Sequence, residues 1–474
     1  MNAINYTNIL GLHASRGHGG SCAPDGEAQL TLSTSHNSDC LTNLMNEIAS
    51  KANLVLAFKA VKRNKGAPGV DNMTVTKVAE NLDIILEELS LALINQTYRP
   101  CPVRGVQIPK ANGGLRQLGI PVVVDRIVQQ AIAQVLTKIY DPTFSNSSFG
   151  FRPKRSANMA IKASSRYVEE GKIWVVDIDL EQFFDKVNHD ILMSKIAKTI
   201  KDKSLLRLIR RFLTAGLMQD GVYLAKGQEG TPQGGPLSPL LSNILLDTLD
   251  KELERRGHSF SRYADDCNIY VNSQMAGKRV MAGITKFLKE RLKLTVNTDK
   301  SAVNKVKHRQ FLGFRILNNA DITISKASLK KIKDKIRKLT KRNRAVSLPV
   351  LIKELNQVIR GWYHYFKDTK SASLMKGLDA WIRRKIRCFR IKQRKRKHSI
   401  KTMLTAMKIN QQDAWSIACS SVGWWRKSLN HIVHRAMNLE WFSKLGLFSL
   451  SLAFGKHNSK TAVCDIAGSV HLIV

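Results

Sequence analysis

The sequence predicts an α+β protein, with strands and helices mixed through residues 99–316 and helices alone after them. Three observations support this class. Strand-like runs flank an Asn-Gly-Gly turn within residues 103–121, which is typical of a β-hairpin. Residues 173–179 form an apolar, β-branched run that ends in acids, as in a buried strand. Residues 326–344 repeat apolar side chains at helical spacing.

The charge balance indicates a polyanionic partner. The chain has 474 residues, with 76 Lys and Arg against 37 Asp and Glu, and a formal net charge of +39. Hydrophobic residues make up 43%, which is ordinary for a folded protein and too many for a disordered basic tail. Such an excess of positive charge repels itself unless a polyanion neutralises it. Nucleic acid is the leading candidate, and an anionic membrane surface is the minor alternative.

Several classes of protein are excluded at this stage. No apolar run approaches the roughly 18–20 residues of a membrane span, and we expect no secretory signal. The seven cysteines are scattered and form no CxxC pair. We therefore expect no zinc site and no disulfide framework, but reduced thiols in a cytoplasmic protein.

The N-terminal part is predicted to be a tail followed by helices. Residues 1–40 are rich in Gly, Ser, Thr, Asn and His, so we expect a flexible tail. Residues 41–98 form a helical extension, with predicted helices over 53–63 and 75–95. A basic loop rich in Gly and Pro, residues 65–69, separates the two helices.

The middle of the chain alternates between strand and helix signals. After the hairpin the pattern predicts, in order, a helix over 125–138, a basic loop over 149–153, the strand over 173–179, helices within 186–220, a Gly/Pro-rich loop over 231–239, a helix over 240–255, a strand–turn–strand around 263–266, a helix over 276–292 and a strand over 311–316.

The C-terminal part is basic and helical. Residues 326–344 hold ten Lys and Arg and one acid, Asp334. We expect an amphipathic helix with one core face and one basic outer face. Residues 388–397 form a second basic run. Solvated helix faces are the simpler reading of both runs, but unneutralised positive charge at this density is costly.

Three acids in two strand contexts suggest a metal site. Asp179 ends the strand over 173–179, and Asp265 and Asp266 lie where two short strands turn. Carboxylates that converge repel one another unless a hard divalent cation lies between them. Taken alone, an Asp-Asp turn is usually just solvated, and Asp179 could equally cap a helix.

The surrounding motifs resemble the successive palm motifs of reverse transcriptases. Three segments occur in the same order as in that family, residues 177–189, 231–239 and 263–266. The resemblance implies a right-hand polymerase with fingers and an antiparallel-sheet palm over 99–316. It makes Asp179, Asp265 and Asp266 the catalytic metal ligands for two Mg²⁺ ions, with Mn²⁺ as an alternative. Asp177 points to the same face as Asp179; alignment on Phe183-Phe184-Asp185 favours Asp179.

The same resemblance implies roles for residues around the acids. Phe184 would exclude the 2′-hydroxyl of a ribonucleotide by steric clash, with Phe183 as the competing candidate. Lys300 would protonate the leaving pyrophosphate, with a surface lysine as the equal alternative. The remaining nucleotide-binding candidates are Lys110 and Arg116 for the triphosphate, and Gln233 and Gly234 beside the templating pair.

The flanking segments resemble bacterial group II intron-encoded reverse transcriptases, or maturases. Residues 65–71, 150–155 and 359–366 carry this likeness. It implies a helical thumb, or maturase-specific, domain over 317–405, a DNA-binding region over 406–450 and a C-terminal tail over 451–474. Family members often add a His-Asn-His endonuclease with paired cysteines. Only Cys419 and Cys464 follow Asn410, so we expect neither the endonuclease nor zinc.

The resemblance therefore predicts an RNA-directed DNA polymerase that copies its group II intron RNA and assists splicing and retrohoming. Its partners would be intron RNA, an RNA template, a DNA primer, target DNA and dNTPs, in the bacterial cytoplasm as a nucleoid-associated ribonucleoprotein. The alternatives are a non-enzymatic RNA-binding splicing factor and a reverse transcriptase of a defence or diversity-generating lineage. The residues expected to bind RNA phosphates are Lys65, Arg152, Lys330, Lys331, Lys338, Arg390, Lys395 and Arg396.

Overall fold

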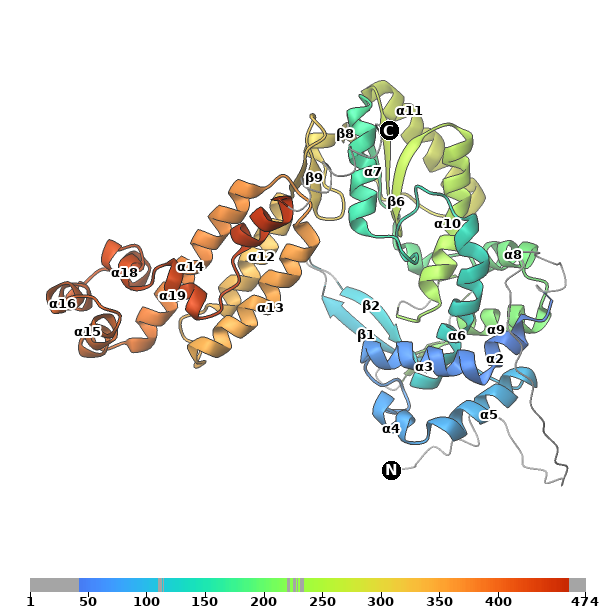
Figure 1. Cartoon of the computed structure of the whole chain (residues 1–474). Helices are drawn as coiled ribbons and strands as arrows, with labels where there is room; N and C mark the ends of the chain where they lie inside the picture. Colours follow the sequence, from blue (N-terminus) through green and yellow to red (C-terminus); the bar gives the residue numbers. More distant parts are fainter. Residues whose placement is uncertain are drawn as a thin grey trace, which may run out of the picture. The chain divides into compact units, whose positions relative to one another are not determined.

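The computed structural model describes residues 42–109, 113, 115–219, 222–224, 227, 229–230 and 234–459, apart from the Arg116 side chain. The tail predicted over 1–40 lies outside these residues. The chain divides into two compact units (Figure 1). The first unit comprises residues 1–164 and 172–304, and the second comprises residues 165–171 and 305–474.

Helices form the N-terminal part of the first unit. These are α2 (Leu44–Ala49), α3 (Lys51–Asn64), α4 (Val75–Glu80), α5 (Leu82–Ile94) and α6 (Val123–Tyr140). Ser50 starts α3, since its side chain accepts a hydrogen bond from the Asn53 backbone N–H. The single helix predicted over 75–95 is wrong. Asn81, at φ −120° and ψ 33°, leaves the helical region and separates α4 from α5.

A four-stranded sheet, here called the fingers sheet, has the order β2-β1-β4-β5. Its strands are β1 (Val103–Pro109), β2 (Leu115–Ile120), β4 (Leu217–Gln219) and β5 (Val222–Leu224). The predicted hairpin is confirmed as the antiparallel pair β1–β2. The strand β4 lies where a helix was expected, because β4 pairs in parallel with β1, more than a hundred residues away.

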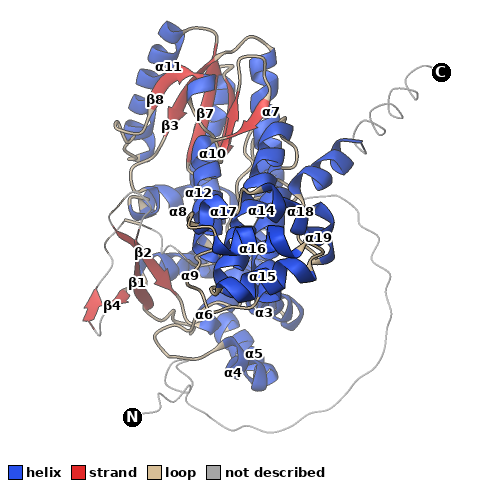
Figure 2. Cartoon of the chain, turned by 90° about the vertical axis from the view of Figure 1, so that its left-hand side faces the viewer, coloured by secondary structure: helices blue, strands red, loops and turns tan. Residues whose placement is uncertain are grey.

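A second four-stranded sheet, here called the palm sheet, has the order β6-β7-β3-β8 (Figure 2). Its strands are β3 (Trp174–Ile178), β6 (Ser259–Tyr263), β7 (Asp266–Val271) and β8 (Ala302–Lys305). After Asp266, β7 is buried at every position, as expected for a central strand that is covered on both faces. Two helices pack on the sheet, α10 (Ser238–Arg255) against β6 and α11 (Gln274–Phe287) against β3 and β7.

Shorter elements connect these layers. They are η2 (Asp141–Thr143), α7 (Ala157–Glu169), η3 (Phe183–Asp185), α8 (His189–Thr199), α9 (Lys203–Thr214) and the π-turn η4 (Leu288–Leu292). The helix predicted over 276–292 is therefore divided in two: α11 covers its first part, and the short π-helix η4 covers its last five residues. The mixture of sheets and helices followed by helices alone confirms the α+β class.

The second unit is helical apart from a small sheet of β9 (Phe314–Ile316) and β10 (Ile322–Ile324). Its other elements are η5 (Val306–His308), α12 (Lys326–Leu339), α13 (Leu348–Phe366), α14 (Ala372–Arg394), α15 (Lys397–Ala406), α16 (Gln411–Cys419), α17 (Trp424–Lys427), α18 (His431–Ala436) and α19 (Leu439–Lys444). The amphipathic helix predicted over 326–344 is α12, which buries Ile332 and Ile336. No helix among the described residues is long and apolar enough to cross a membrane.

The aromatic residues of α13 pack into the second unit. The ring of Phe366 lies 4.8 Å from that of Phe314 and 5.0 Å from that of Trp362. Tyr363 is buried and donates a hydrogen bond to the Ala453 carbonyl at 2.8 Å. The aromatic cluster over 359–366 is therefore mainly a packing feature.

The start of the predicted tail over 451–474 is wrong, because residues 450–459 are helical. The buried carboxylate of Asp379, on α14, accepts hydrogen bonds from the backbone N–H groups of Leu450 at 3.0 Å and Ser451 at 2.9 Å. These N–H groups lie in the first turn, where no intrahelical partner exists. A side chain from another helix thus caps this segment and extends the helical region.

Candidate active site

The turn between β6 and β7 presents two of the predicted catalytic acids. The antiparallel register pairs Tyr263 with Asp266, so Ala264 and Asp265 form a two-residue turn. Ala264 has a φ of +59°, in the left-handed region. Two-residue hairpin turns need positive φ because their twist then matches that of the strands. The turn leaves Asp265 and Asp266 at the tip of the hairpin.

The third acid reaches the same place from β3. This strand pairs antiparallel with β7, and Ile178 lies opposite Cys267. Asp179 directly follows Ile178 at the end of β3, and its negative charge acts on Asp266. Asp177 pairs with Asn268 and stays close enough to act on Asp266 electrostatically. Residues far apart in the sequence thus converge through strand register.

The electrostatics of the acids reflect their crowding. The Asp266 side chain reaches the surface, but neighbouring atoms remove much of its solvent. This desolvation, with the negative charges of Asp265, Asp177 and Asp179, raises the pKa of Asp266 to about 7. Lys300 acts in the opposite direction. The site therefore holds more negative charge than its cationic neighbour offsets.

Lys300 is brought to Asp179 by the segment that precedes β8. The Asn297 backbone N–H donates to the Asp179 carbonyl at 2.9 Å, and the Asp179 N–H donates to the Ser301 hydroxyl at 3.0 Å. The Asn297 side chain accepts from the Lys300 N–H at 3.3 Å, which closes a local turn. Lys300 Nζ then lies 3.3 Å from Asp179 Oδ1, with 62% of the lysine side chain exposed.

The acids have the chemistry of a divalent-cation site. Carboxylate oxygens are the ligands that hard cations prefer, and two of the three acids are neighbours in one turn. After desolvation, the negative charges of Asp265, Asp177 and Asp179 also raise the pKa of Asp266, and a cation would relieve that repulsion. Within the described residues, no three His, Cys, Asp or Glu side chains are already arranged to hold an ion. The carboxylates suit a hard cation by their chemistry, and in this structure Asp179 pairs with Lys300.

Burial separates the two phenylalanines that follow Asp179. Phe183 is 2% exposed and belongs to the core. Phe184 is only partly buried, and its ring meets that of Phe183 edge-on at 5.2 Å. Of the two, Phe184 is the ring that reaches the surface, so the geometry favours it over Phe183 as the steric filter.

Glycines bring the loop after residue 233 close to the fingers sheet. Gly234 has a φ of +126°, and a Cβ there would overlap the Gly119 carbonyl of β2. A Cβ at Gly235 would overlap the Gln129 side chain. Glycine is therefore required at Gly234, whereas at Gly235 a Cβ would need only the end of the Gln129 side chain to move. Lys110, Gln233 and the Arg116 side chain lie outside the described residues; the Arg116 backbone pairs with Ile108.

Two residues beside the acids were missed by the sequence analysis. Arg262, two residues before Ala264, is fully buried, and Gly150 contacts the Ala264 backbone. One signal in the sequence could have revealed Arg262. It is an arginine inside a predicted strand, and a charge buried there needs a partner. Nothing local to the sequence identifies that partner.

Most of the predicted RNA contacts are accessible, and one is not. Exposed cations lie at the end of α3, on α12 and between α14 and α15; they are Lys65, Lys330, Lys331, Lys338, Lys395 and Arg396. Arg390 is partly buried and donates to Gln393 at 2.9 Å. Arg152 as an RNA contact is wrong. Its side chain is 5% exposed and binds Asp141 at 2.7 Å and the Ser145 carbonyl at 2.6 Å.

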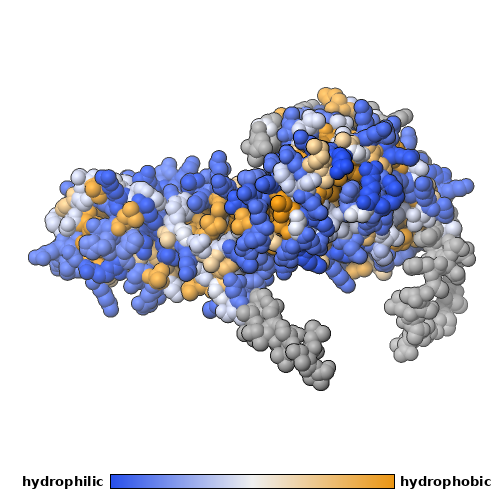
Figure 3. Space-filling model, turned by 90° about the horizontal axis from the view of Figure 1, so that it is seen from above, coloured by the Kyte–Doolittle hydropathy of each residue, from blue (hydrophilic) through white to orange (hydrophobic). Residues whose placement is uncertain are grey.

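A basic hollow of about 1150 Å³ lies between α12, α14 and α17 in the second unit. Here it is called the basic groove, and its lining includes Arg337, Lys338, Lys341, Arg342, Lys385, Lys392, Trp424 and Trp425. Lys385 and Lys392 lie over the indole rings, 4.8 Å from Trp425 and 5.1 Å from Trp424. On the face shown in Figure 3, hydrophilic residues dominate the surface of this unit, at the left of the view.

Comparisons with known proteins agree with this geometry. The family model described as "Reverse transcriptase (RNA-dependent DNA polymerase)" matches residues 108–316. The model described as "Group II intron, maturase-specific domain" matches residues 329–406. The two matches occupy the parts of the chain where the resemblance was first recognised.

Two relatives, YkfC and LtrA, support the same assignment. Protein YkfC of Escherichia coli (strain K12) is 34% identical over 305 residues, which span 56% of this chain and 80% of that protein. Group II intron-encoded protein LtrA of Lactococcus lactis subsp. cremoris is 38% identical over 210 residues, which span 44% of this chain and 34% of LtrA. A solved structure of apo telomerase from Candida tropicalis is 12% identical, with a TM-score of 0.41, over 83% of this chain and 88% of that one. The chain therefore belongs to the reverse transcriptases, the RNA-directed DNA polymerases, and among them to the group II intron-encoded proteins that carry a maturase-specific domain.

Proposed function

We propose that this reverse transcriptase copies its group II intron RNA into DNA by two-metal nucleotidyl transfer and binds that RNA to assist splicing and retrohoming. One observation carries the proposal. The charges of Asp265 and Asp179 both act on Asp266, and Lys300 Nζ lies 3.3 Å from Asp179 Oδ1. Three acids and one lysine are the groups that nucleotide addition requires.

The reaction is attack of a primer 3′-hydroxyl on the α-phosphate of a dNTP. When bound, two Mg²⁺ ions, or Mn²⁺ in their place, supply activation of the hydroxyl and charge neutralisation at the phosphate. Asp179, Asp265 and Asp266 would hold these ions. Lys300 would donate a proton to the departing pyrophosphate.

The remaining residues would bind and select the nucleotide. Lys110 and Arg116 would hold the triphosphate. The Phe184 ring would occupy the space that a ribose 2′-hydroxyl needs. Steric exclusion is required because a hydrophobic pocket alone rejects an added hydroxyl only weakly. Gln233 and Gly234 would lie beside the templating pair, where glycine permits close backbone approach.

The basic groove supports RNA binding by the second unit. Many cations converge on one hollow that contains one acid, Asp334. Lysine and arginine bind phosphates largely without regard to sequence, and the intron would be distinguished by RNA shape and exposed loops. We assign the contacts to Lys330, Lys331, Lys338, Arg390, Lys395 and Arg396, with Lys65 on the first unit. The region over 406–450 would contact target DNA.

Primer extension tests the polymerase. Wild-type protein, an RNA template, a DNA primer and dNTPs with Mg²⁺ should give extended product, and the Asp265→Ala/Asp266→Ala variant should give none. The matched control is Asp83→Ala/Glu87→Ala, which removes two exposed acids from α5 and should extend as the wild type does. Absence of wild-type extension across a range of salt concentrations would refute the proposal. Splicing that persists in the Asp265/Asp266 variant would show that RNA binding and polymerisation are separable.

RNA binding is tested by its salt dependence. Replacing Lys338 with Gln should reduce the slope of log affinity against log salt by about 0.7–0.9, the value for one lost phosphate contact. Lys138→Gln, an exposed lysine on α6 of the first unit, is the control. An unchanged slope for Lys338→Gln would remove this residue from the interface.

A further inference from the structure

We propose that Arg262 is a positioning residue, which holds the Asp265-Asp266 turn in the geometry that binds the catalytic cations. This inference rests on the polymerase function proposed above and adds a residue to it. Arg262 touches no substrate in this arrangement. Its effect reaches the acids through the backbone of the turn that carries them.

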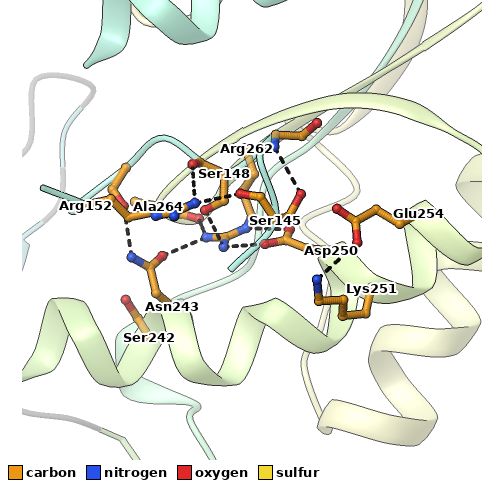
Figure 4. A network of polar contacts seen from close by, with 12 residues as sticks. Ser145, Ser148, Arg152, Ser242, Asn243, Asp250, Lys251, Glu254, Arg262 and Ala264 are labelled. Atoms are coloured by element: carbon orange, nitrogen blue, oxygen red, sulfur yellow. Dashed lines mark hydrogen bonds and ion pairs between the residues drawn. The ribbon is translucent and has the colours of Figure 1, made fainter. Parts of the chain in front are cut away.

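Every donor of the Arg262 guanidinium is used (Figure 4). The Nε and one Nη2 donor bind the Asp250 carboxylate at 2.7 and 2.6 Å, and the other Nη2 donor binds the Ser148 hydroxyl at 2.8 Å. The two Nη1 donors bind the Asn243 side-chain oxygen and the Ala264 carbonyl, both at 2.9 Å. A guanidinium has five N–H donors in a fixed fork, so this network leaves none unsatisfied.

The Ala264 carbonyl is the link to the acids. Ala264 is not glycine, yet its φ of +59° lies where side-chain-bearing residues are uncommon. The residue directly precedes Asp265, so its conformation sets the direction in which both carboxylates leave the hairpin. The Arg262 hydrogen bond fixes the carbonyl of this residue from within the buried interior.

The loop that contains Ser147, Phe149 and Gly150 also contacts the turn. The Phe149 N–H donates to the Arg262 carbonyl, and the Arg262 N–H donates to the Ser147 carbonyl, both at 2.9 Å. A Cβ on Gly150 would overlap the Ala264 backbone nitrogen. The Asn243 side chain joins this loop to the same guanidinium, because its Nδ2 donates to the Gly150 carbonyl at 2.9 Å.

Arg152 gives this loop a fixed shape. Its guanidinium binds Asp141 at 2.7 Å and the Ser145 and Ser148 carbonyls at 2.6 and 3.1 Å. Arg152 was expected from the sequence to contact RNA. Its hydrogen bonds instead hold this loop together from within. The loop thus links Asp141, at the end of α6, to the turn that carries Asp265 and Asp266.

The contribution of Arg262 is geometric. Its charge is matched by Asp250 on α10, and both side chains are fully buried. Burial by itself would lower the pKa of the Arg262 guanidinium, but the Asp250 carboxylate outweighs burial and raises it. The guanidinium therefore stays charged and paired. Lysine can keep this pairing, but it lacks the planar fork that reaches Ala264, Asn243 and Ser148 together.

The test is Arg262→Lys in the full-length protein. We expect kcat for primer extension to fall between about ten- and a hundredfold, the cost of a small misplacement of catalytic groups, with the KM for dNTP nearly unchanged. Amide hydrogen exchange in the peptide covering residues 260–270 should become faster. Arg255→Lys, at an exposed arginine on α10, is the matched control and should change neither quantity.

A second substitution separates positioning from general stability. Glycine adopts the Ala264 conformation without strain, so Ala264→Gly should restore part of the kcat lost in Arg262→Lys. A loss of kcat that Ala264→Gly leaves unchanged would overturn the proposal, as would wild-type kcat and exchange in a folded Arg262→Lys protein. If Arg262→Lys fails to fold, Asn243→Ala provides the test instead. This substitution leaves the Arg262–Asp250 pair intact and should still make amide hydrogen exchange in the turn faster. Unchanged exchange there would overturn the proposal.

The exchange measurement also separates this inference from the proposed function. A wild-type protein that fails to extend primers would refute the polymerase, while exchange in residues 260–270 would still report whether Arg262 holds the turn.

Discussion

The stability of the first unit should depend on the ionisation of Asp125, and substitution with asparagine should remove that dependence. Asp125 lies in the first turn of α6 and is 1% exposed. Its carboxylate accepts a hydrogen bond from the Tyr98 hydroxyl and one from the Cys101 backbone N–H at 3.0 Å. Asparagine has nearly the same shape and can keep both partners without a charge.

The magnitude follows from the shifted pKa. Burial is the main cause, opposed by the two hydrogen bonds and helped by the negative charge of Asp71, and it raises the pKa of Asp125 to about 7. In the unfolded chain the group titrates near pH 4, so between these values the folded protein holds a proton that the unfolded chain has lost. Stability therefore falls as pH rises through this window, by about 1.4 kcal/mol per pH unit and about 4 kcal/mol in total.

The assay is urea denaturation of wild type and Asp125→Asn from pH 4 to pH 8.5. Other groups titrate in both proteins, so the difference between their unfolding free energies isolates Asp125. We expect Asp125→Asn to become more stable relative to wild type as pH rises, and the difference to level off above about pH 8. A difference that is constant with pH would refute the reasoning, because the buried carboxyl would then not change its ionisation on folding.

Three further outcomes are expected. Phe184→Ala should lower the ratio of kcat/KM for dNTP to that for rNTP by about tenfold or more, since the partly exposed ring is the proposed steric barrier. Steady-state primer extension with each nucleotide measures this ratio. An unchanged ratio would exclude Phe184 as the barrier. Gly150→Ala should cost about 1–3 kcal/mol of stability and reduce extension, because its Cβ would overlap the Ala264 backbone. Thermal denaturation checks this against Gly377→Ala, which meets open space in α14 and should be neutral or stabilising. Raising the salt concentration should weaken RNA binding by the second unit steeply, whereas an apolar interface would be nearly insensitive.

The elements that the sequence predicts well are those that depend on local patterns. The hairpin over 103–121 follows from its Asn-Gly-Gly turn, and α12 follows from apolar residues at helical spacing. The acids Asp179, Asp265 and Asp266 could be named because three motifs occur in a fixed order. Neighbours in the chain supply the information for the hairpin and α12, and the resemblance to a known family supplies it for the acids.

Other features depend on contacts between distant residues, and only the tertiary structure decides them. The pairing of β3 with β7 brings Asp179 within electrostatic reach of Asp266, and a salt bridge holds Lys300 beside Asp179. Burial assigns Phe183 to the core, leaves Phe184 at the surface and converts Arg152 from an expected RNA contact into an internal clamp.

Arg262 is the clearest case of a residue whose role the sequence alone leaves hidden. Its partners come from a loop, a helix and its own hairpin, including Ser148, Asn243 and Asp250. A charged side chain in a buried strand is stable only when such partners surround it. The sequence by itself determined the kind of chemistry that this protein performs, and the packing of distant segments decided which side chains hold that chemistry in place.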